Sequence, residues 1–139
     1  MQLDHICLAV RKIDKARSVL TTLLGYTPKT EKVENSRQQV VVQFFSKPGG
    51  LDIKLIEPSS LASPLVSFLK KGEGLHHLGF KVDDVTHSLD VLAGQGVRVT
   101  AAPQPGEAFD EALIAFAYLG SGLNVELIDT DERRNLIGG

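Results

Sequence analysis

The first half of the chain combines apolar runs typical of strands with one amphipathic helical stretch. Apolar residues dominate positions 3 to 10, which we predict to form a strand. Asp14 is a suitable N-cap for a following helix whose apolar residues recur at helical spacing, and Gly25 is a suitable end for it. Two further strand-like runs flank a Pro-Gly-Gly turn and predict a hairpin: residues 39 to 46 and 51 to 57.

The second half repeats this order of segments. The pattern predicts a strand at 77 to 82 and a helix from Val85 to Leu92. A linker of about residues 59–74 separates the halves and contains a short apolar cluster that could form a helix. After about residue 132 the chain is polar and ends in two glycines, so we expect a mobile tail at about 132–139. Three more strands are predicted at 97 to 100, 112 to 119 and 123 to 129.

Two blocks of sequence occur twice at one spacing, which indicates an internal duplication. The block around His5 reads LDHICLAV and matches LHHLGFKV around His77, an offset of 77 − 5 = 72. The block around Lys54 reads GLDIKLIE and matches GLNVELID around Glu126, again an offset of 126 − 54 = 72. We therefore predict a single α+β domain over residues 1–139, built from two tandem βαβββ modules at about 1–58 and 75–131.

Composition narrows the range of partners and compartments. Hydrophobic residues make up 42% of the chain, enough for one core, and the net charge of -2 leaves no basic field for nucleic acid. No apolar run is long enough to cross a membrane, and we expect no leader segment before the first strand. The single cysteine, Cys7, cannot form an intramolecular disulfide. We expect a cytoplasmic protein whose partner is a small molecule rather than nucleic acid or a membrane.

Strand alternation places four polar side chains on the face that points away from the helices. These are the two repeat-equivalent pairs, His5 with His77 and Lys54 with Glu126. If the modules join edge to edge, this face becomes a concave pocket in which the four converge. Two imidazoles and a carboxylate form a ligand set suited to zinc, nickel, cobalt, manganese or iron(II), so His5, His77 and Glu126 are candidate metal ligands.

Lys54 complicates a metal site, because an ammonium does not ligate a metal and repels a dication. In a metal-bound version the ion stabilises an enolate, and in a metal-free version Lys54 replaces the ion while Glu126 acts as the base. Two structural alternatives stay open. Lys54 and Glu126 could form an ion pair without catalysis, and either histidine could be a hydrogen-bonded core residue.

These residues resemble the vicinal oxygen chelate superfamily, which includes glyoxalase I, bleomycin resistance proteins, ring-cleaving dioxygenases and methylmalonyl-CoA epimerase. The resemblance is closest to methylmalonyl-CoA epimerase-like proteins. It implies a curved eight-stranded mixed sheet with helices on the convex face, a divalent ion on His5, His77 and Glu126, a CoA thioester or 2-oxo substrate, and a homodimer. It is carried by these segments: Leu3-Asp4-His5-Ile6, GEGLHHLGFKVDD at 72–84, Ile114-Ala115-Phe116 and Val125-Glu126-Leu127.

The chain departs from this family at positions that matter for chemistry. The family carries Gln or Glu where this chain has Lys54, and the epimerase base is a glutamate where this chain has Val42 or Gln43. We predict an epimerase-like or glyoxalase-like enzyme that works through an enolate-like intermediate, with Glu126 and Lys54 catalytic. The alternative is a metal-free protein of the same fold that binds or sequesters a small molecule. The predicted substrate pocket contains Cys7, Gln43, Lys81 and Phe116.

Overall fold

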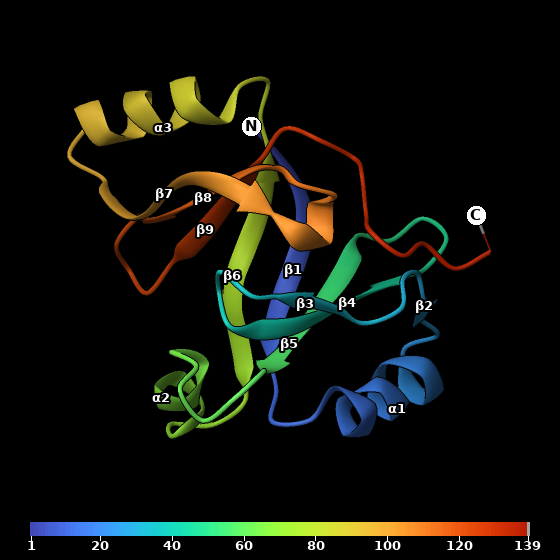
Figure 1. Cartoon of the computed structure of the whole chain (residues 1–139). Coiled ribbons are helices and arrows are strands. Elements are labelled where there is room, and N and C mark those ends of the chain that lie inside the picture. Colours follow the sequence, from blue (N-terminus) through green and yellow to red (C-terminus); the bar gives the residue numbers. More distant parts are fainter. Residues whose placement is uncertain (139) are drawn as a thin grey trace.

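The computed structural model of the chain describes residues 1–138 (Figure 1). Its elements are, in chain order, β1 Gln2–Ala9, α1 Ile13–Leu23, β2 Thr27–Pro28, β3 Val33–Asn35, β4 Val40–Ser46, β5 Asp52–Pro58, α2 Leu65–Leu69, β6 Gly74–Lys81, α3 Val85–Gly94, β7 Arg98–Gly106, a 3-10 turn Glu107–Phe109, β8 Ala112–Tyr118 and β9 Asn124–Ile128. The strands form one mixed sheet in the order β2-β4-β5-β1-β6-β9-β8-β7, and β3 pairs with β4.

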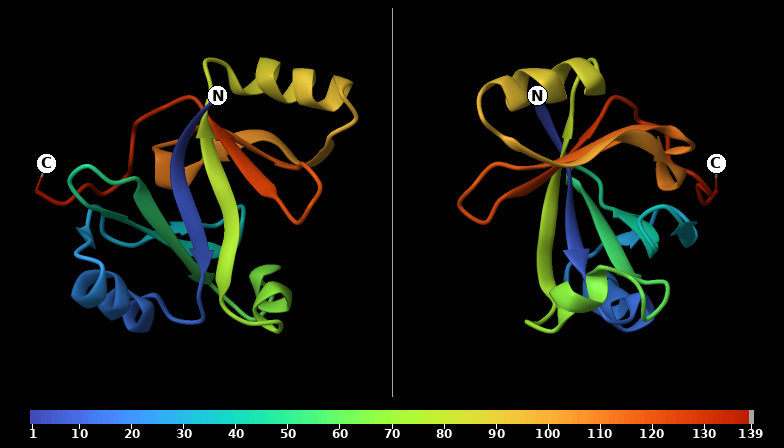
Figure 2. Two further views of the ribbon diagram at one scale, coloured as in Figure 1. Left: turned by 180° about the vertical axis from the view of Figure 1, so that it is seen from behind. Right: turned by 60° about the vertical axis from the view of Figure 1, so that its left-hand side comes forward.

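The two modules have the same strand pairing and meet at their first strands. In the first module β1 pairs in parallel with β5, and in the second module β6 pairs in parallel with β9. The antiparallel pair of β1 and β6 joins the modules at the centre of the sheet (Figure 2). The predicted α+β fold from duplicated modules is confirmed. The sheet has nine strands instead of eight, because the segment between α1 and β4 forms two short strands.

Alternation along the strands divides the core into two faces. On the outer face, Ile13 and Leu20 of α1 pack with strand residues Phe45 and Leu55, and α3 packs there on the second module. The opposite, inner face carries the four polar residues of the predicted site, and α2 packs on this side through Leu65 and Leu69. The two long helices, α1 and α3, therefore cover the outer face, as the pattern predicts. The short helix α2 instead packs at one end of the inner face.

The ends of α1 differ in how well the sequence predicts them. The N-cap is Lys12, which makes no side-chain capping hydrogen bond, and Asp14 lies within the first turn, where its carboxylate pairs with Lys32 at 2.7 Å. The prediction of Asp14 as the N-cap was therefore wrong, because the helix begins two residues earlier. Gly25 follows the helix with a φ of 73°, the left-handed conformation that glycine adopts without strain, as expected for a helix end.

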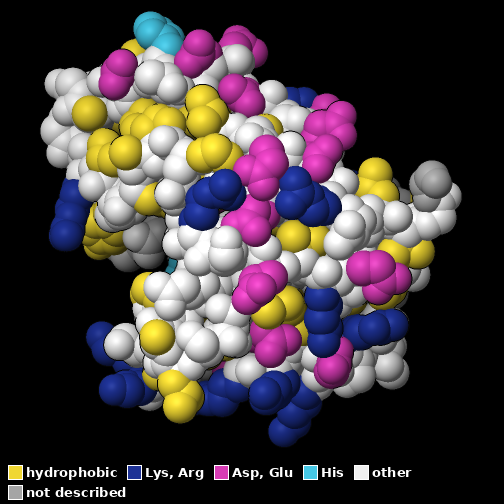
Figure 3. Space-filling model, viewed as in Figure 1, with side chains coloured by type: hydrophobic (Ala, Val, Ile, Leu, Met, Phe, Trp, Pro, Cys, Tyr) yellow, Lys and Arg dark blue, Asp and Glu magenta, His cyan; other side chains and the backbone are white. Residues whose placement is uncertain are grey.

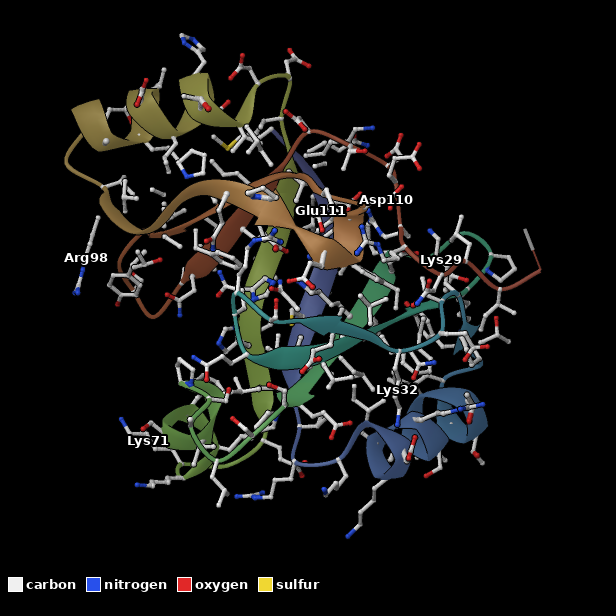
Figure 4. All side chains as sticks on the ribbon, viewed as in Figure 1. Lys29, Lys32, Lys71, Arg98, Asp110 and Glu111 are labelled. Atoms are coloured by element: carbon white, nitrogen blue, oxygen red, sulfur yellow. The ribbon has the colours of Figure 1, made fainter. Side chains whose placement is uncertain are left out.

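The segment after β9 folds back across both modules, as the red trace of Figure 1 shows. The backbone N–H of Arg134 donates to Ala108 O at 3.0 Å, and that of Ile137 donates to Lys29 O at 3.0 Å. The Arg134 guanidinium also contacts Asp110 and Glu111, two residues labelled in Figure 4. The polarity of this segment predicts a mobile tail, but the contacts of Arg134 and Ile137 attach it to the domain. Gly139, the last residue of the predicted tail, lies outside the described residues.

Acidic and basic side chains lie side by side in the middle of the face drawn in Figure 3, whereas acidic groups predominate toward its top and basic groups along its lower edge. Ion pairs such as Arg37 with Glu111 at 3.2 Å join the two signs. Within residues 1–138, none of the helices is long and apolar enough to cross a membrane.

Candidate active site

Four buried side chains meet where the two modules join. The register is the same in both halves, since Lys54 lies opposite Cys7 and Glu126 lies opposite Gly79, the repeat equivalent of Cys7. The duplication therefore brings its equivalent positions around one point, as strand alternation predicts. The exposed fractions are small: His5 0%, Lys54 4%, His77 2% and Glu126 0%.

Small residues opposite the two histidines make room for their rings. In the ladder between β1 and β6, Gly79 faces His5 and Cys7 faces His77. A Cβ atom on Gly79 would lie only 2.0 Å from Cε1 of His5, so the ring occupies the space that a side chain would need. Cys7 is fully buried, and burial raises the pKa of its thiol to about 12. Its role at this position is that of a small, unionised core residue.

Glu126 is the centre of the hydrogen-bond network. Its Oε1 lies 2.9 Å from His5 Nε2, 3.2 Å from His77 Nε2 and 3.1 Å from Lys54 Nζ. Burial alone would raise the pKa of Glu126, but the Lys54 ammonium and the hydrogen bonds from both histidines hold it well below its usual value. Three donors already contact Oε1, which suits a group that holds its neighbours in place, and the role of Glu126 as the base stays a prediction.

A second set of charged groups holds His5 from its other side. Nδ1 of His5 lies 2.7 Å from the Asp4 carboxylate, which also accepts from the Arg133 guanidinium at 2.7 Å. The guanidinium lies over the rings of Phe44 and Phe109, at 4.5 and 4.9 Å from the two centroids. Sequence reasoning missed this chain of contacts, because Arg133 belongs to the segment that composition marks as mobile.

A cavity of about 280 Å³ opens beside this network. Lys54, His77 and Glu126 line it, whereas His5 does not and lies behind Glu126. Its wall combines aliphatic side chains with a few polar groups, as small-molecule sites do. The aliphatic part includes Val40, Val42, Ile56 and Leu65, and the polar part includes Asn35, Gln38, Thr100 and Asn124.

Of the four predicted pocket residues, one lines the cavity and three lie elsewhere. Phe116 lines the cavity. Gln43 does not, because alternation along β4 turns it to the outer face, where its Nε2 donates to Thr30 O at 2.9 Å. Lys81 lies at the end of β6 and pairs with Asp131 at 2.7 Å, and Cys7 lies in the inner core. Val42, not Gln43, is the residue of β4 that reaches the cavity beside Val40.

His76 lines the cavity although strand alternation predicts that it points away from it. The β1–β6 register shifts between Cys7 and Leu8, which pair with His77 and Leu75, so that His76 is the extra residue of a bulge. A bulge redirects a side chain, and here it turns His76 toward His77, with the two Nδ1 atoms 2.8 Å apart. A register shift of this kind leaves no mark in the hydrophobic pattern.

The hydrogen bonds fix which nitrogen of His76 is free. Burial lowers the pKa of His77 to about 3 and that of His76 to about 4, so both rings are neutral near pH 7. The Glu126 carboxylate only accepts, so His77 donates to it from Nε2 and accepts at Nδ1. His76 must then donate from Nδ1, which leaves its Nε2 as a free acceptor.

These neutral histidines make stability depend on pH. Both folded-state pKa values lie below the ordinary 6.5, so in mild acid the unfolded chain binds more protons than the folded chain. The stability that the two neutral histidines provide is therefore complete above about pH 6.5 and is lost as the pH falls toward their folded-state pKa values. We expect the free energy of unfolding to fall by roughly 1–3 kcal/mol per pH unit between about pH 6 and 4, measured by urea unfolding. The His76→Asn variant should lose about half of this slope, and an unchanged slope would contradict the neutral state of His76.

The same network contains a candidate set of metal ligands. His5, His77 and Glu126 offer ligand atoms that all lie within 4.8 Å of one another. The Lys54 ammonium, however, lies 3.1 Å from the shared Glu126 Oε1 and would repel a dication bound there. With Lys54 protonated, these residues do not fit a divalent ion. A second group of possible ligands within the same 4.8 Å limit consists of Cys7, His76 and His77.

Known proteins resemble this chain in sequence and in fold. Residues 4–116 match the model of the Glyoxalase/Bleomycin resistance protein/Dioxygenase superfamily. The chain is 41% identical over 100 residues to the uncharacterized protein YqjC of Bacillus subtilis, which covers 70% of this chain and 69% of that protein. It is 28% identical over 106 residues to the ethylmalonyl-CoA/methylmalonyl-CoA epimerase of Cereibacter sphaeroides, a match that covers 75% of this chain and 78% of that protein.

A solved structure has a similar fold. It is a variant of Streptomyces coelicolor methylmalonyl-CoA epimerase in complex with 2-nitronate-propionyl-CoA, with a TM-score of 0.81 and 26% identity, and the match covers 94% of this chain and 95% of that chain. The resemblance predicted from the sequence is confirmed.

Proposed function

Because this chain belongs to the Glyoxalase/Bleomycin resistance protein/Dioxygenase superfamily, we propose that it is an enzyme that forms an enolate from a carbonyl compound, either a CoA thioester or a 2-oxo acid. Two similarities support a thioester. One relative is named for ethylmalonyl-CoA and methylmalonyl-CoA, and a structural neighbour holds a CoA ligand. The predicted reaction classes, isomerase and lyase, both include reactions that pass through an enolate.

The observation that carries this proposal is an ammonium and a neutral imidazole in the wall of one cavity. Enolate formation removes a proton from the carbon beside a carbonyl group and leaves negative charge on the oxygen. The Lys54 ammonium stabilises that charge, and Nε2 of His76 accepts the proton. Burial lowers the pKa of His76 to about 4, and the negative charge that forms beside the ring favours its protonated form as the proton is transferred. Glu126 holds Lys54 in place and, through His77, fixes the tautomer of His76.

The apolar β4 side of the cavity bears on the type of reaction. Val40 and Val42 contribute aliphatic side chains there, and Val42 is one of the two positions at which the epimerase resemblance predicts a glutamate. With His76 as the proton acceptor, one group removes and returns the proton on one face of the enolate. This is sufficient for exchange of the α-proton with solvent, which is therefore the reaction step to look for, whereas inversion at that carbon would need a second proton donor on the other face.

Solvent exchange tests the proposed function directly. Methylmalonyl-CoA, ethylmalonyl-CoA and simple 2-oxo acids would be incubated with the chain in D₂O, and loss of the α-proton followed by NMR. We expect exchange with the wild type and a rate at least about 100-fold lower for His76→Asn, because a positioned base contributes at least that factor. His87→Asn, which changes an exposed histidine on α3, is the matched control and should exchange like the wild type. Binding of these compounds without any exchange would favour the sequestering alternative instead.

A further inference from the structure

We propose that the candidate active site carries its own cation, the Lys54 ammonium, in the place where a divalent ion would bind, and that the chain therefore works without a metal. The part of this inference that concerns a substrate oxygen rests on the proposed function. The part that concerns the metal does not.

The contacts of Lys54 are those of a built-in, charged group. Its Nζ lies 3.1 and 3.3 Å from the two carboxylate oxygens of Glu126, and its exposed fraction is 4%. The ammonium also lies over the ring of Phe109, 5.2 Å from the centroid, and 6.0 Å from that of Phe44. A carboxylate and aromatic faces both attract an ammonium.

Glu126 cannot serve the ammonium and a dication equally well. Either oxygen of Glu126 that could ligate an ion together with His5 and His77 already accepts from Lys54, Oε1 at 3.1 Å and Oε2 at 3.3 Å. An ion at that point would share one carboxylate charge with the ammonium a few ångströms away, in a site that excludes most water. Like charges at such a distance repel strongly, so the ion enters only if Lys54 leaves or loses its proton.

The internal duplication explains why a lysine at this position matters. Lys54 and Glu126 are 72 residues apart in the chain and occupy equivalent positions of the two modules. Two acidic residues at these positions would face each other and would need a cation from solution. A lysine in one of them supplies the compensating charge as part of the chain.

One N–H of the ammonium remains for a ligand. An ammonium has three donors, and within residues 1–138 the hydrogen bonds of Lys54 Nζ go to the two oxygens of Glu126. Lys54 also lines the cavity. The third donor can therefore bind the oxygen of a carbonyl group in the cavity, where a preorganised cation stabilises an oxyanion.

Metal titration of the full chain tests this inference. Chelator-treated wild type, Lys54→Gln and Lys81→Gln would be titrated with cobalt(II), nickel(II) and zinc(II) by calorimetry. We expect no ion at the His5 site of the wild type, and affinity at least about 100-fold higher in Lys54→Gln. Lys81→Gln removes the same charge from the end of β6 and should behave like the wild type. Adding His5→Gln to Lys54→Gln should abolish the gain.

The wild-type titration decides the outcome even if Lys54→Gln does not fold. Stoichiometric binding to the wild type that disappears in His5→Gln would overturn the inference. Binding that survives His5→Gln lies outside the His5 site and leaves the role of Lys54 intact. Exchange that persists in chelator supports the inference, and exchange that needs added metal refutes it while leaving the proposed function standing. If no compound exchanges at all, the proposed function fails and the titration still tests Lys54.

Discussion

The Gly79→Ala variant should lose the geometry of the candidate active site and about 2–5 kcal/mol of unfolding free energy. The new Cβ would lie 2.0, 2.3 and 2.4 Å from three atoms of the His5 ring. The ring cannot move aside freely, because it is fully buried and is held by Asp4 at 2.7 Å and Glu126 at 2.9 Å. Relief of the clash therefore breaks at least one buried hydrogen bond to a charged group. Urea unfolding would measure the loss of stability.

Gly94→Ala is the matched control for this substitution. A Cβ on Gly94 meets nothing within 4 Å, and the residue ends α3. Alanine should leave stability unchanged or raise it by up to about 1 kcal/mol, because it favours the helix. Equal stability of the two variants would show that the ring of His5 does not pack against Gly79.

The Lys54→Met variant should lose about 3–5 kcal/mol of unfolding free energy near pH 7, because it leaves the Glu126 carboxylate buried without its cation. Without Lys54 the pKa of Glu126 rises, since burial then acts against the charged form with less compensation. The difference in stability between variant and wild type should therefore shrink as the pH falls and Glu126 takes up a proton.

A double-mutant cycle checks that this loss comes from the unpaired carboxylate. The variant with both Lys54→Met and Glu126→Gln contains no buried carboxylate at this point, so it should be more stable than Lys54→Met alone. Urea unfolding of the four proteins gives the coupling energy. Strictly additive losses would mean that Lys54 and Glu126 do not interact in the folded protein.

The sequence predicts the centre of the site well because a repeat provides two independent signals for each position. His5 and His77 are each ambiguous alone, but their equivalence places both on the inner face, where the structure has them. The same equivalence predicts that Lys54 and Glu126 face each other, and they form the ion pair that the sequence analysis left open as an alternative to catalysis.

Other parts of the site depend on features that hydrophobic periodicity does not contain. The turn of His76 into the cavity results from a register shift between two distant strands. The burial of Arg133 at 5% exposure results from tertiary contacts of a polar segment, whose guanidinium packs against the neighbouring rings of Phe44 and Phe109. The assignment of Gln43 to the pocket was wrong for a different reason. The match to the family motif did not decide between Val42 and Gln43, and because adjacent strand residues point to opposite faces, only Val42 reaches the cavity.

The ion pair between equivalent positions also determines how the two halves of the chain recognise each other. Two first halves brought together at the β1 edge would place one Lys54 ammonium against another, and two second halves would oppose two Glu126 carboxylates. Each self-association buries like charges, whereas a first half with a second half buries a neutral pair. Separate fragments of the two halves should therefore associate with each other in a one-to-one ratio. Although the two modules are built alike, their charges favour pairing of a first half with a second half over pairing of two identical halves.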